Sequence, residues 1–113
     1  MFDGQPKEVI VYQTADGTEP FSKWLGKLHD ASARARIETR LDRLRVQGNP
    51  GDYKEAGGVY ELRIDYGPGY RLYLAFAGRR IVLLLCGGDK RTQAADLKRA
   101  LRYWQDYQQR NKP

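Results

Sequence analysis

Apolar residues in the first half of the chain recur with the period of an α-helix. Four of them have the i, i+3, i+4 and i+7 spacing of one helical face: Phe21, Trp24, Leu25 and Leu28. A second helix is predicted from Asp30 to just before Gly48, a residue type suited to the left-handed position that ends a helix. Its buried face would carry Ile37, Leu41 and Leu44. Because the connection is short, the two helices are predicted to form an antiparallel hairpin.

Strand patterns precede and follow these helices. The β-branched run in residues 7–13 predicts one strand, and apolar residues alternate with polar ones in residues 59–65 and 70–77. Residues 81–86 are apolar throughout, which predicts an interior strand covered on both faces. The glycine-rich segments 48–58 and 87–92 are predicted to be loops. Residues 92–109 predict a final helix with one apolar stripe: Ala94, Leu97, Leu101 and Trp104.

The predicted order is therefore β-α-α-β-β-β-α. It indicates an α+β fold in which a small, mostly antiparallel sheet is combined with an N-terminal helix hairpin and a C-terminal helix. A chain of 113 residues is expected to form a single domain, residues 1–113. No apolar run approaches the roughly 20 residues of a membrane span, and the first residues do not resemble a signal peptide. A cytoplasmic protein without a membrane partner is expected.

The composition of the chain favours an anionic partner and excludes several kinds of site. The chain has 20 Lys and Arg against 14 Asp and Glu, a formal net charge of +6, which favours an anionic partner such as nucleic acid. The single Cys86 excludes an intrachain disulfide and a cysteine-based zinc site, and the single His29 excludes a mechanism that needs two histidines. No His, Asp or Glu cluster has metal-ligand spacing, so neither a metal nor another cofactor is expected.

Alternation in the strands sorts polar residues onto one face of the sheet. The residues expected to face the core are Leu62, Ile64, Leu72, Leu74 and Phe76. The opposite, open face would then carry Glu61, Arg63, Arg71 and Tyr73. Arginine suits planar, bidentate recognition of phosphate, so this face is a candidate site. Alternatively, these are ordinary solvent-facing residues in cross-strand pairs.

Two further segments carry positive charge. In residues 87–92, free backbone N–H groups together with Lys90 and Arg91 would form an anion site before the last helix. Alternatively, this segment is a simple connection in which Thr92 caps the helix. On the second helix, three arginines at helical spacing form either a solvated face or a binding surface for a polyanion: Arg36, Arg40 and Arg43.

Two motifs resemble a known family. Residues 58–71, GVYELRIDYGPGYR, and residues 84–93, LLCGGDKRTQ, are similar to the addiction-module killer proteins. These are phage-derived, Gp49-like and HigB-like toxins of the RelE/ParE superfamily. The resemblance covers essentially the whole chain, and the two motifs are specific in combination. It implies the toxin of a type II toxin–antitoxin pair, with a fold of two helices packed on a small twisted sheet.

Within the superfamily, one branch cleaves mRNA in the ribosomal A site and another inhibits DNA gyrase. Arg71 matches the arginine that binds the scissile phosphate in the mRNA-cleaving branch. Arg63 matches a basic residue on the preceding strand of that branch, and Lys90 matches a basic residue in the loop before its last helix. Glu61 stands where the mRNA-cleaving branch has a lysine. That branch often has a tyrosine after the loop that precedes the last helix, and this chain has no counterpart of it near Asp96. These differences leave the proton-transfer groups open.

Attack of a 2′-hydroxyl on the neighbouring phosphate needs charge stabilisation and proton transfer. Arg63, Arg71 and Lys90 could stabilise the charge. The candidates for proton transfer are Glu61, Asp89, Tyr73 and Lys90.

The leading hypothesis is a metal-independent, ribosome-dependent mRNA endonuclease. Its RNA or ribosome contacts would include Arg36, Arg40, Arg43 and Arg91. A cognate antitoxin, commonly of the helix-turn-helix type, would neutralise it in a hetero-oligomer, with residues 103–107 as a candidate contact. The alternatives are a gyrase-inhibiting toxin without nuclease activity and a non-catalytic basic RNA-binding module.

Overall fold

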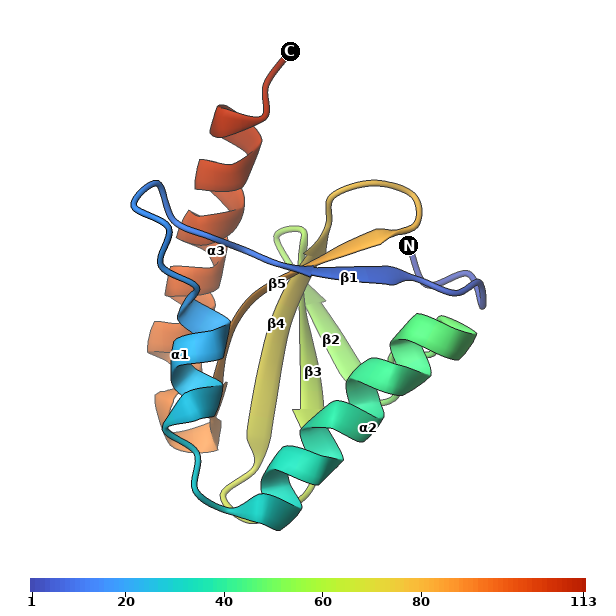
Figure 1. The fold of residues 1–113 in the computed structure, drawn as a ribbon, viewed down its shortest axis with the longest axis vertical. Coiled ribbons are helices and arrows are strands. Elements are labelled where there is room, and N and C mark those ends of the chain that lie inside the picture. Colours follow the sequence, from blue (N-terminus) through green and yellow to red (C-terminus); the bar gives the residue numbers. More distant parts are fainter.

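The computed structural model describes residues 1–113, which form five strands and three α-helices (Figure 1). The elements in chain order are β1 (Glu8–Val11), α1 (Pro20–Gly26), α2 (Ala31–Gln47), β2 (Tyr53–Ala56), β3 (Val59–Ile64), β4 (Tyr70–Phe76), β5 (Ile81–Asp89), a 3-10 turn (Lys90–Thr92) and α3 (Gln93–Arg110). The α+β class is confirmed, whereas the predicted order lacked one strand. No helix of this structure is both long and apolar enough to span a membrane.

The additional strand, β2, lies inside the segment that was predicted to be a loop. It pairs antiparallel with β3 at one edge of the sheet, with Tyr53 opposite Leu62. Its sequence Tyr53–Ala56 is mostly polar, and its first three residues are exposed. A strand that buries neither face has no alternation of apolar residues, so the pattern gave no signal for it.

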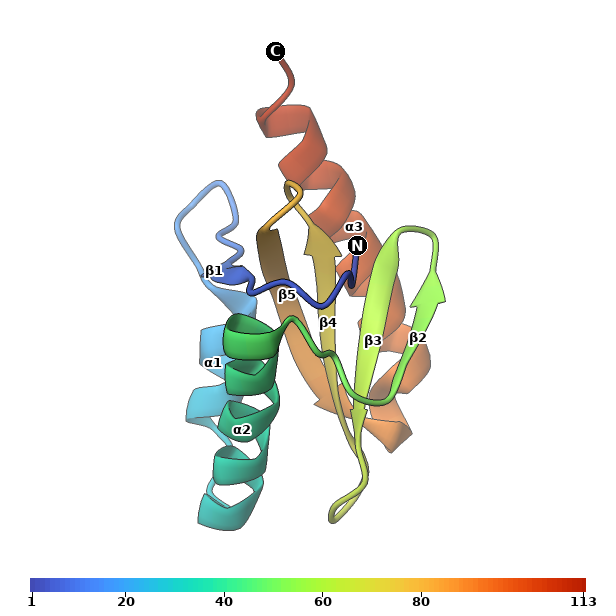
Figure 2. The same cartoon turned by 90° about the vertical axis from the view of Figure 1, so that its right-hand side faces the viewer.

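The sheet is mixed, with strand order β1-β5-β4-β3-β2. The β1–β5 pair is parallel and the other pairs are antiparallel. Helices α1 and α2 lie on one side of the sheet and α3 lies on the other (Figure 2). The predicted hairpin is open, because α1 and α2 diverge from their connection in a V (Figure 1). Three layers result, and the face of the sheet that was expected to be open is largely covered by α3.

Two clusters of buried residues hold the layers together. The cluster beneath α1 and α2 contains the predicted core residues of α2, Ile37, Leu41 and Leu44, together with alternate residues of β3 and β4. The cluster beneath α3 contains Tyr73, Ala75 and Ala100. Strand β5 contributes to both clusters, as expected for an interior strand. Helix α2 ends at Gly48 as predicted, with φ of 64°, whereas Asp30, predicted as the first residue of the helix, is its N-cap and accepts from the backbone of the first turn.

A β-bulge in β5 changes which way its side chains point. Leu74 of β4 pairs with Leu84, but the residue before it, Tyr73, pairs with Cys86. Leu85 is therefore an additional residue, and both Leu85 and Cys86 join the cluster beneath α3. After the bulge, Gly87 faces the helices on one side of the sheet and Gly88 faces α3 on the other.

The two glycines belong to β5, so the predicted loop at residues 87–92 is wrong for its first half. A Cβ at Gly87 would overlap the ring of Trp24, and a Cβ at Gly88 would overlap the carboxylate of Asp96. Trp24 comes from α1 and Asp96 from α3. The glycines thus allow both helices to approach the same point of the strand.

Replacing Gly88 with Ala is expected to lower the free energy of unfolding by about 1–3 kcal/mol, because the added Cβ forces packed elements apart. Gly26→Ala is the matched control, since a Cβ there meets nothing within 4 Å and should be neutral or raise stability by up to about 1 kcal/mol. Urea unfolding of the two variants measures the difference. Equal midpoints would contradict the close contact between β5 and α3.

Candidate active site

Two arginines face each other across neighbouring strands. Arg63 of β3 is in register with Arg71 of β4, so both side chains lie on the same face of the sheet. Like charges placed directly opposite are unfavourable, and each guanidinium has its own carboxylate. Arg63 Nη2 lies 2.8 Å from Asp52 Oδ1, and Arg71 Nη1 lies 3.0 Å from Glu61 Oε1. The carboxylates allow the two cations to remain side by side.

The arginine pair opens onto a shallow depression of about 400 Å³. Lys90 reaches the same depression from the end of β5, beside the turn that contains Gly69. The structure therefore brings Arg63, Arg71 and Lys90 together, as the alternation and the resemblance predicted. The complete lining is Asp52, Arg63, Ile64, Asp65, Gly69, Tyr70, Arg71 and Lys90. We call this the arginine depression.

Glu61 is buried behind the arginine depression, where three side chains donate hydrogen bonds to it. Arg71 Nη1 donates at 3.0 Å, the Tyr73 hydroxyl at 3.1 Å, and Gln93 Nε2 at 3.0 and 3.2 Å to the two carboxylate oxygens. Glu61 is 5% exposed and Tyr73 is 0% exposed, so neither lies on an open face as predicted. The reason is α3, which covers this part of the sheet and contributes Gln93.

These contacts bear on whether Glu61 and Tyr73 can transfer protons, the role for which both were candidates. Burial, followed by the negative charge of Glu61, raises the pKa of the Tyr73 hydroxyl above its usual value. Glu61 accepts bonds at both of its oxygens from groups inside the protein. Neither residue is placed to exchange a proton with a ligand in the arginine depression. Glu61 instead fixes the position of Arg71.

Arg71 is the more enclosed of the two arginines. Its side chain is 12% exposed, against 40% for Arg63. In both residues the Nε–H group is buried and has no hydrogen-bond partner. Buried donors are nearly always paired in folded proteins, so an unpaired one needs an explanation, and a catalytic or ligand-binding role is one of them. Two such donors at one pair of residues distinguish this depression from the rest of the surface.

A family model for phage-derived Gp49-like proteins matches residues 23–103. The chain belongs to the Gp49-like family, a RelE-like toxin family. A protein of Haemophilus influenzae, described as uncharacterized, is 50% identical to it over 84 residues, which cover 74% of this chain and 84% of the relative. The family is associated with the toxins of toxin–antitoxin systems. All residues that line the arginine depression lie within the matched range.

In this Gp49-like protein, the predicted residues Asp89 and Arg91 lie at the start of the 3-10 turn. Asp89 caps the turn, accepting from the backbone N–H of Arg91 at 2.9 Å, while the Arg91 guanidinium lies 3.2 Å from its other oxygen. Burial raises the pKa of Asp89, but the hydrogen bonds and charge of Arg91 outweigh it, so the pKa lies below its usual value. Thr92, the alternative cap of the final helix, forms no side-chain capping bond to α3; Asp89 caps the 3-10 turn instead, and Thr92 completes a reciprocal capping box there.

The arginines of α2 do not form one solvated row. Arg40 donates to the carbonyl oxygens of Pro50, Asp52 and Arg63, and is half-buried. It therefore links α2 to the segment that carries Asp52. Arg36 lies over the ring of Tyr66, 4.4 Å from its centroid, and Arg43 is exposed.

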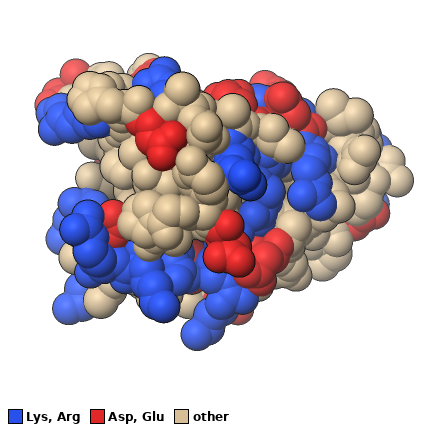
Figure 3. Space-filling model, turned by 90° about the horizontal axis from the view of Figure 1, so that it is seen from below, with Lys and Arg blue, Asp and Glu red and all other residues tan.

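Arg36, Arg40 and Arg43 line a second shallow depression, which shares Ile64 and Asp65 with the arginine depression. The two depressions are therefore neighbours. Viewed from below, the molecule shows several patches of Lys and Arg side chains, separated by acidic and uncharged surface (Figure 3). Arg36 and Arg43 can contact a polyanion, whereas Arg40 is mainly structural.

Sequence reasoning missed three participants in the site. Asp52 lies in the segment assigned to a loop, and Gln93 is a polar residue in the first turn of α3. Asp65 is exposed at the rim of the arginine depression. Gln93 ends the motif Lys90-Arg91-Thr92-Gln93, which was the one signal available for it.

Arg40→Ala is expected to lower the free energy of unfolding by about 2–3 kcal/mol, because three carbonyl oxygens, two of them in partly buried bonds, lose a charged donor. Arg43→Ala, one turn along the same helix, should change it by less than about 0.5 kcal/mol. Thermal or urea unfolding distinguishes the two variants. Similar, small effects of both would show that Arg40 belongs to the solvated face after all.

Proposed function

We propose that this Gp49-like protein is the toxin of a type II toxin–antitoxin pair and cleaves mRNA on the ribosome without a metal ion. The observation that carries the proposal is the convergence of Arg63, Arg71 and Lys90 on one depression. A phosphodiester is the ligand that such a set suits best, since guanidinium groups recognise phosphate oxygens in a bidentate manner and lysine adds a mobile charge. The family membership supports the toxin assignment.

Cleavage by the neighbouring 2′-hydroxyl builds negative charge on the phosphate oxygens. A cation held in place before the reaction stabilises that charge without reorganisation. Arg71 fits this role because Glu61 holds its Nη1 at 3.0 Å inside the protein. Arg63, which is more exposed, would bind the same phosphate or an adjacent one, and Lys90 would neutralise the remaining charge.

Proton transfer would fall to other groups than Glu61 and Tyr73, which are enclosed. Lys90 and Asp65 line the arginine depression and are exposed, and no hydrogen bond from the protein engages either side chain. We infer that they are the candidates of this chain for proton transfer, with the ribosome orienting the mRNA so that the 2′-hydroxyl is in line for attack.

An antitoxin is the partner that the toxin–antitoxin family implies. We propose that it contacts the C-terminal part of α3, which projects beyond the sheet (Figure 1). Trp104 and Tyr107 are stacked there with ring centroids 5.9 Å apart, and both are partly exposed. Partly exposed aromatic residues are typical anchors of protein interfaces. A helix-turn-helix antitoxin remains the expected type.

Arg71→Ala tests the nuclease assignment. Cleavage of a defined mRNA on purified ribosomes should fall by roughly 10²–10³-fold, as expected when one preorganised donor is lost. Arg71→Lys should recover only part of the activity, because an ammonium cannot form the bidentate pair. Arg79→Ala, in the exposed turn between β4 and β5, is the matched control and should cleave normally.

Other outcomes would favour the alternatives. If Arg71→Ala is folded and remains fully toxic, and transcript 5′ ends are unchanged while DNA damage signalling rises, the protein is a gyrase-directed toxin. If the unmodified protein binds RNA but neither cleaves it nor slows growth, it is a non-catalytic RNA-binding module. Either result overturns the proposal.

A further inference from the structure

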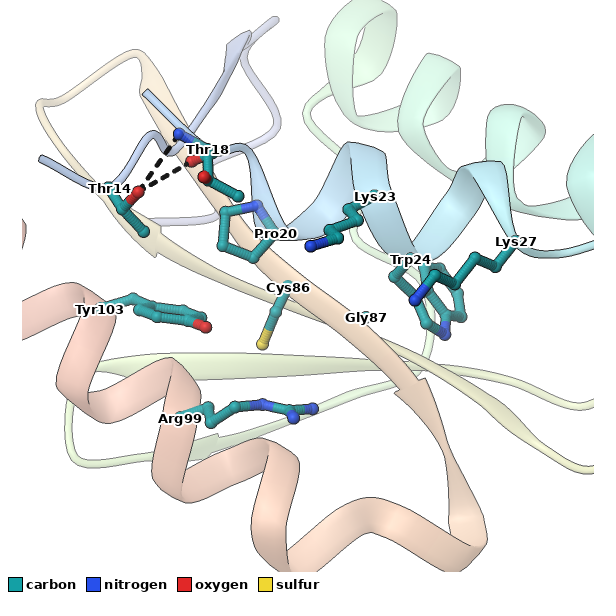
Figure 4. Close-up of a pocket in the computed structure, with 10 residues that line it drawn as sticks. All are labelled: Thr14, Thr18, Pro20, Lys23, Trp24, Lys27, Cys86, Gly87, Arg99 and Tyr103. Carbon is teal, nitrogen blue, oxygen red and sulfur yellow. Dashed lines mark hydrogen bonds between the residues drawn. The ribbon is translucent and has the colours of Figure 1, made fainter. Parts of the chain in front are cut away.

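A third hollow, of about 320 Å³, lies between α1 and α3, away from the two depressions described above (Figure 4). Its floor is the part of β5 that follows the end of pairing with β1, at Cys86 and Gly87. One wall is α1 with the loop before it, and the other wall is α3. We call it the helix groove, and none of the residues assigned above to catalysis lines it.

The charge of the helix groove is positive. Lys23 of α1, Lys27 directly after α1 and Arg99 of α3 line it, and no carboxylate does. The guanidinium of Arg99 is paired with the buried Asp96, which sets its position and compensates its charge. Neither lysine is in an ion pair. The free charge of the groove therefore comes from the two lysines, which favour an anionic ligand.

The walls of the helix groove also carry one aromatic ring each, Trp24 on α1 and Tyr103 on α3 (Figure 4). Both are held from behind: Trp24 lies against Gly87, and Tyr103 is stacked on Tyr12 with centroids 5.0 Å apart. Both rings are partly exposed. Fixed aromatic rings beside mobile cations are the combination by which proteins bind single-stranded nucleic acid, with bases stacked on the rings and phosphates on the cations.

We propose that the helix groove binds one nucleotide of single-stranded RNA, with its base against Trp24 or Tyr103 and its phosphates on Lys23 and Lys27. This rests on the proposed function in one respect, that RNA is the target of the protein. Tyr70 separates the groove from the arginine depression: it lines the depression, and its ring lies 6.2 Å from that of Trp24. The groove is therefore a neighbour of the depression, and the proposal assigns both to one RNA strand.

The two tryptophans of the chain allow the groove to be observed directly. Trp104→Phe leaves Trp24 as the single tryptophan, on the wall of the groove, and circular dichroism checks that this variant is folded. A heptaadenylate with 2′-O-methyl riboses, which cannot be cleaved by 2′-hydroxyl attack, is titrated into it. Base stacking is expected to quench the fluorescence of Trp24 in a saturable manner.

Lys23→Ala with Lys27→Ala in that background should weaken binding by roughly tenfold at 0.1 M salt and lower the salt slope by about 1.4, about 0.7 for each phosphate contact with a single strand. Lys54→Ala with Lys112→Ala is the control, because it removes the same charge from exposed sites outside the groove. The control should bind as the Trp104→Phe parent does.

Three results would overturn the proposal: no saturable quenching, an equal loss of affinity in both double variants, or equally tight quenching by hexaglutamate, which would indicate an acidic protein partner instead. The assay contains no ribosome and measures no cleavage. Failure of the groove therefore leaves the Arg71 experiment untouched, and failure of that experiment leaves the fluorescence result valid.

Discussion

Two like charges on neighbouring strands can be kept together only if the protein supplies opposite charges at the right distance, and this constraint organises the molecule around Arg63 and Arg71. The buried counter-charge is Glu61, the partner of Arg71. Helix α3 covers this carboxylate and contributes Gln93, which donates hydrogen bonds to it. The outer charge is Asp52, on the segment before β2 that Arg40 ties to α2. All three layers thus contribute to holding one pair of guanidiniums. Under the proposed function, a phosphate in the arginine depression would meet two guanidiniums whose positions are already set.

Strand β5 connects this site with the rest of the fold. Its bulge turns Gly87 toward α1 and Gly88 toward α3, and Gly88 is in register with Arg71. The helices can therefore approach β5 closely on both faces, next to the strand that carries the enclosed arginine. The same approach leaves the helix groove beside Gly87. The arginine depression and the groove are two consequences of one local arrangement of β5.

Much of this could be predicted from the sequence. Helical spacing identified the buried face of α2, and alternation placed Arg63 and Arg71 on one face. The prediction that this face is open was wrong. The apolar stripe on α3 indicates that one side of the helix is buried, but it does not indicate which face of the sheet the helix covers. Ala94, counted in that stripe, is exposed, while the polar Asp96 is buried against Gly88. The hydrogen bonds from Arg40 to main-chain carbonyl oxygens could not be predicted from the sequence around Arg40. They depend on the path of residues 50–52, which brings these carbonyl oxygens next to α2.

The central claim is that Glu61 is a structural anion that positions Arg71, and a double-mutant cycle on the free energy of unfolding tests it most directly. The variants are Glu61→Gln, Arg71→Met and their combination, each measured by urea unfolding at neutral pH. Removing either partner alone leaves a largely buried charge unpaired, so each single change should be costly and the combination should cost less than the sum. We predict a coupling energy of about 1–3 kcal/mol. A coupling energy within about 0.5 kcal/mol of zero would show that the two side chains act independently and would contradict the account.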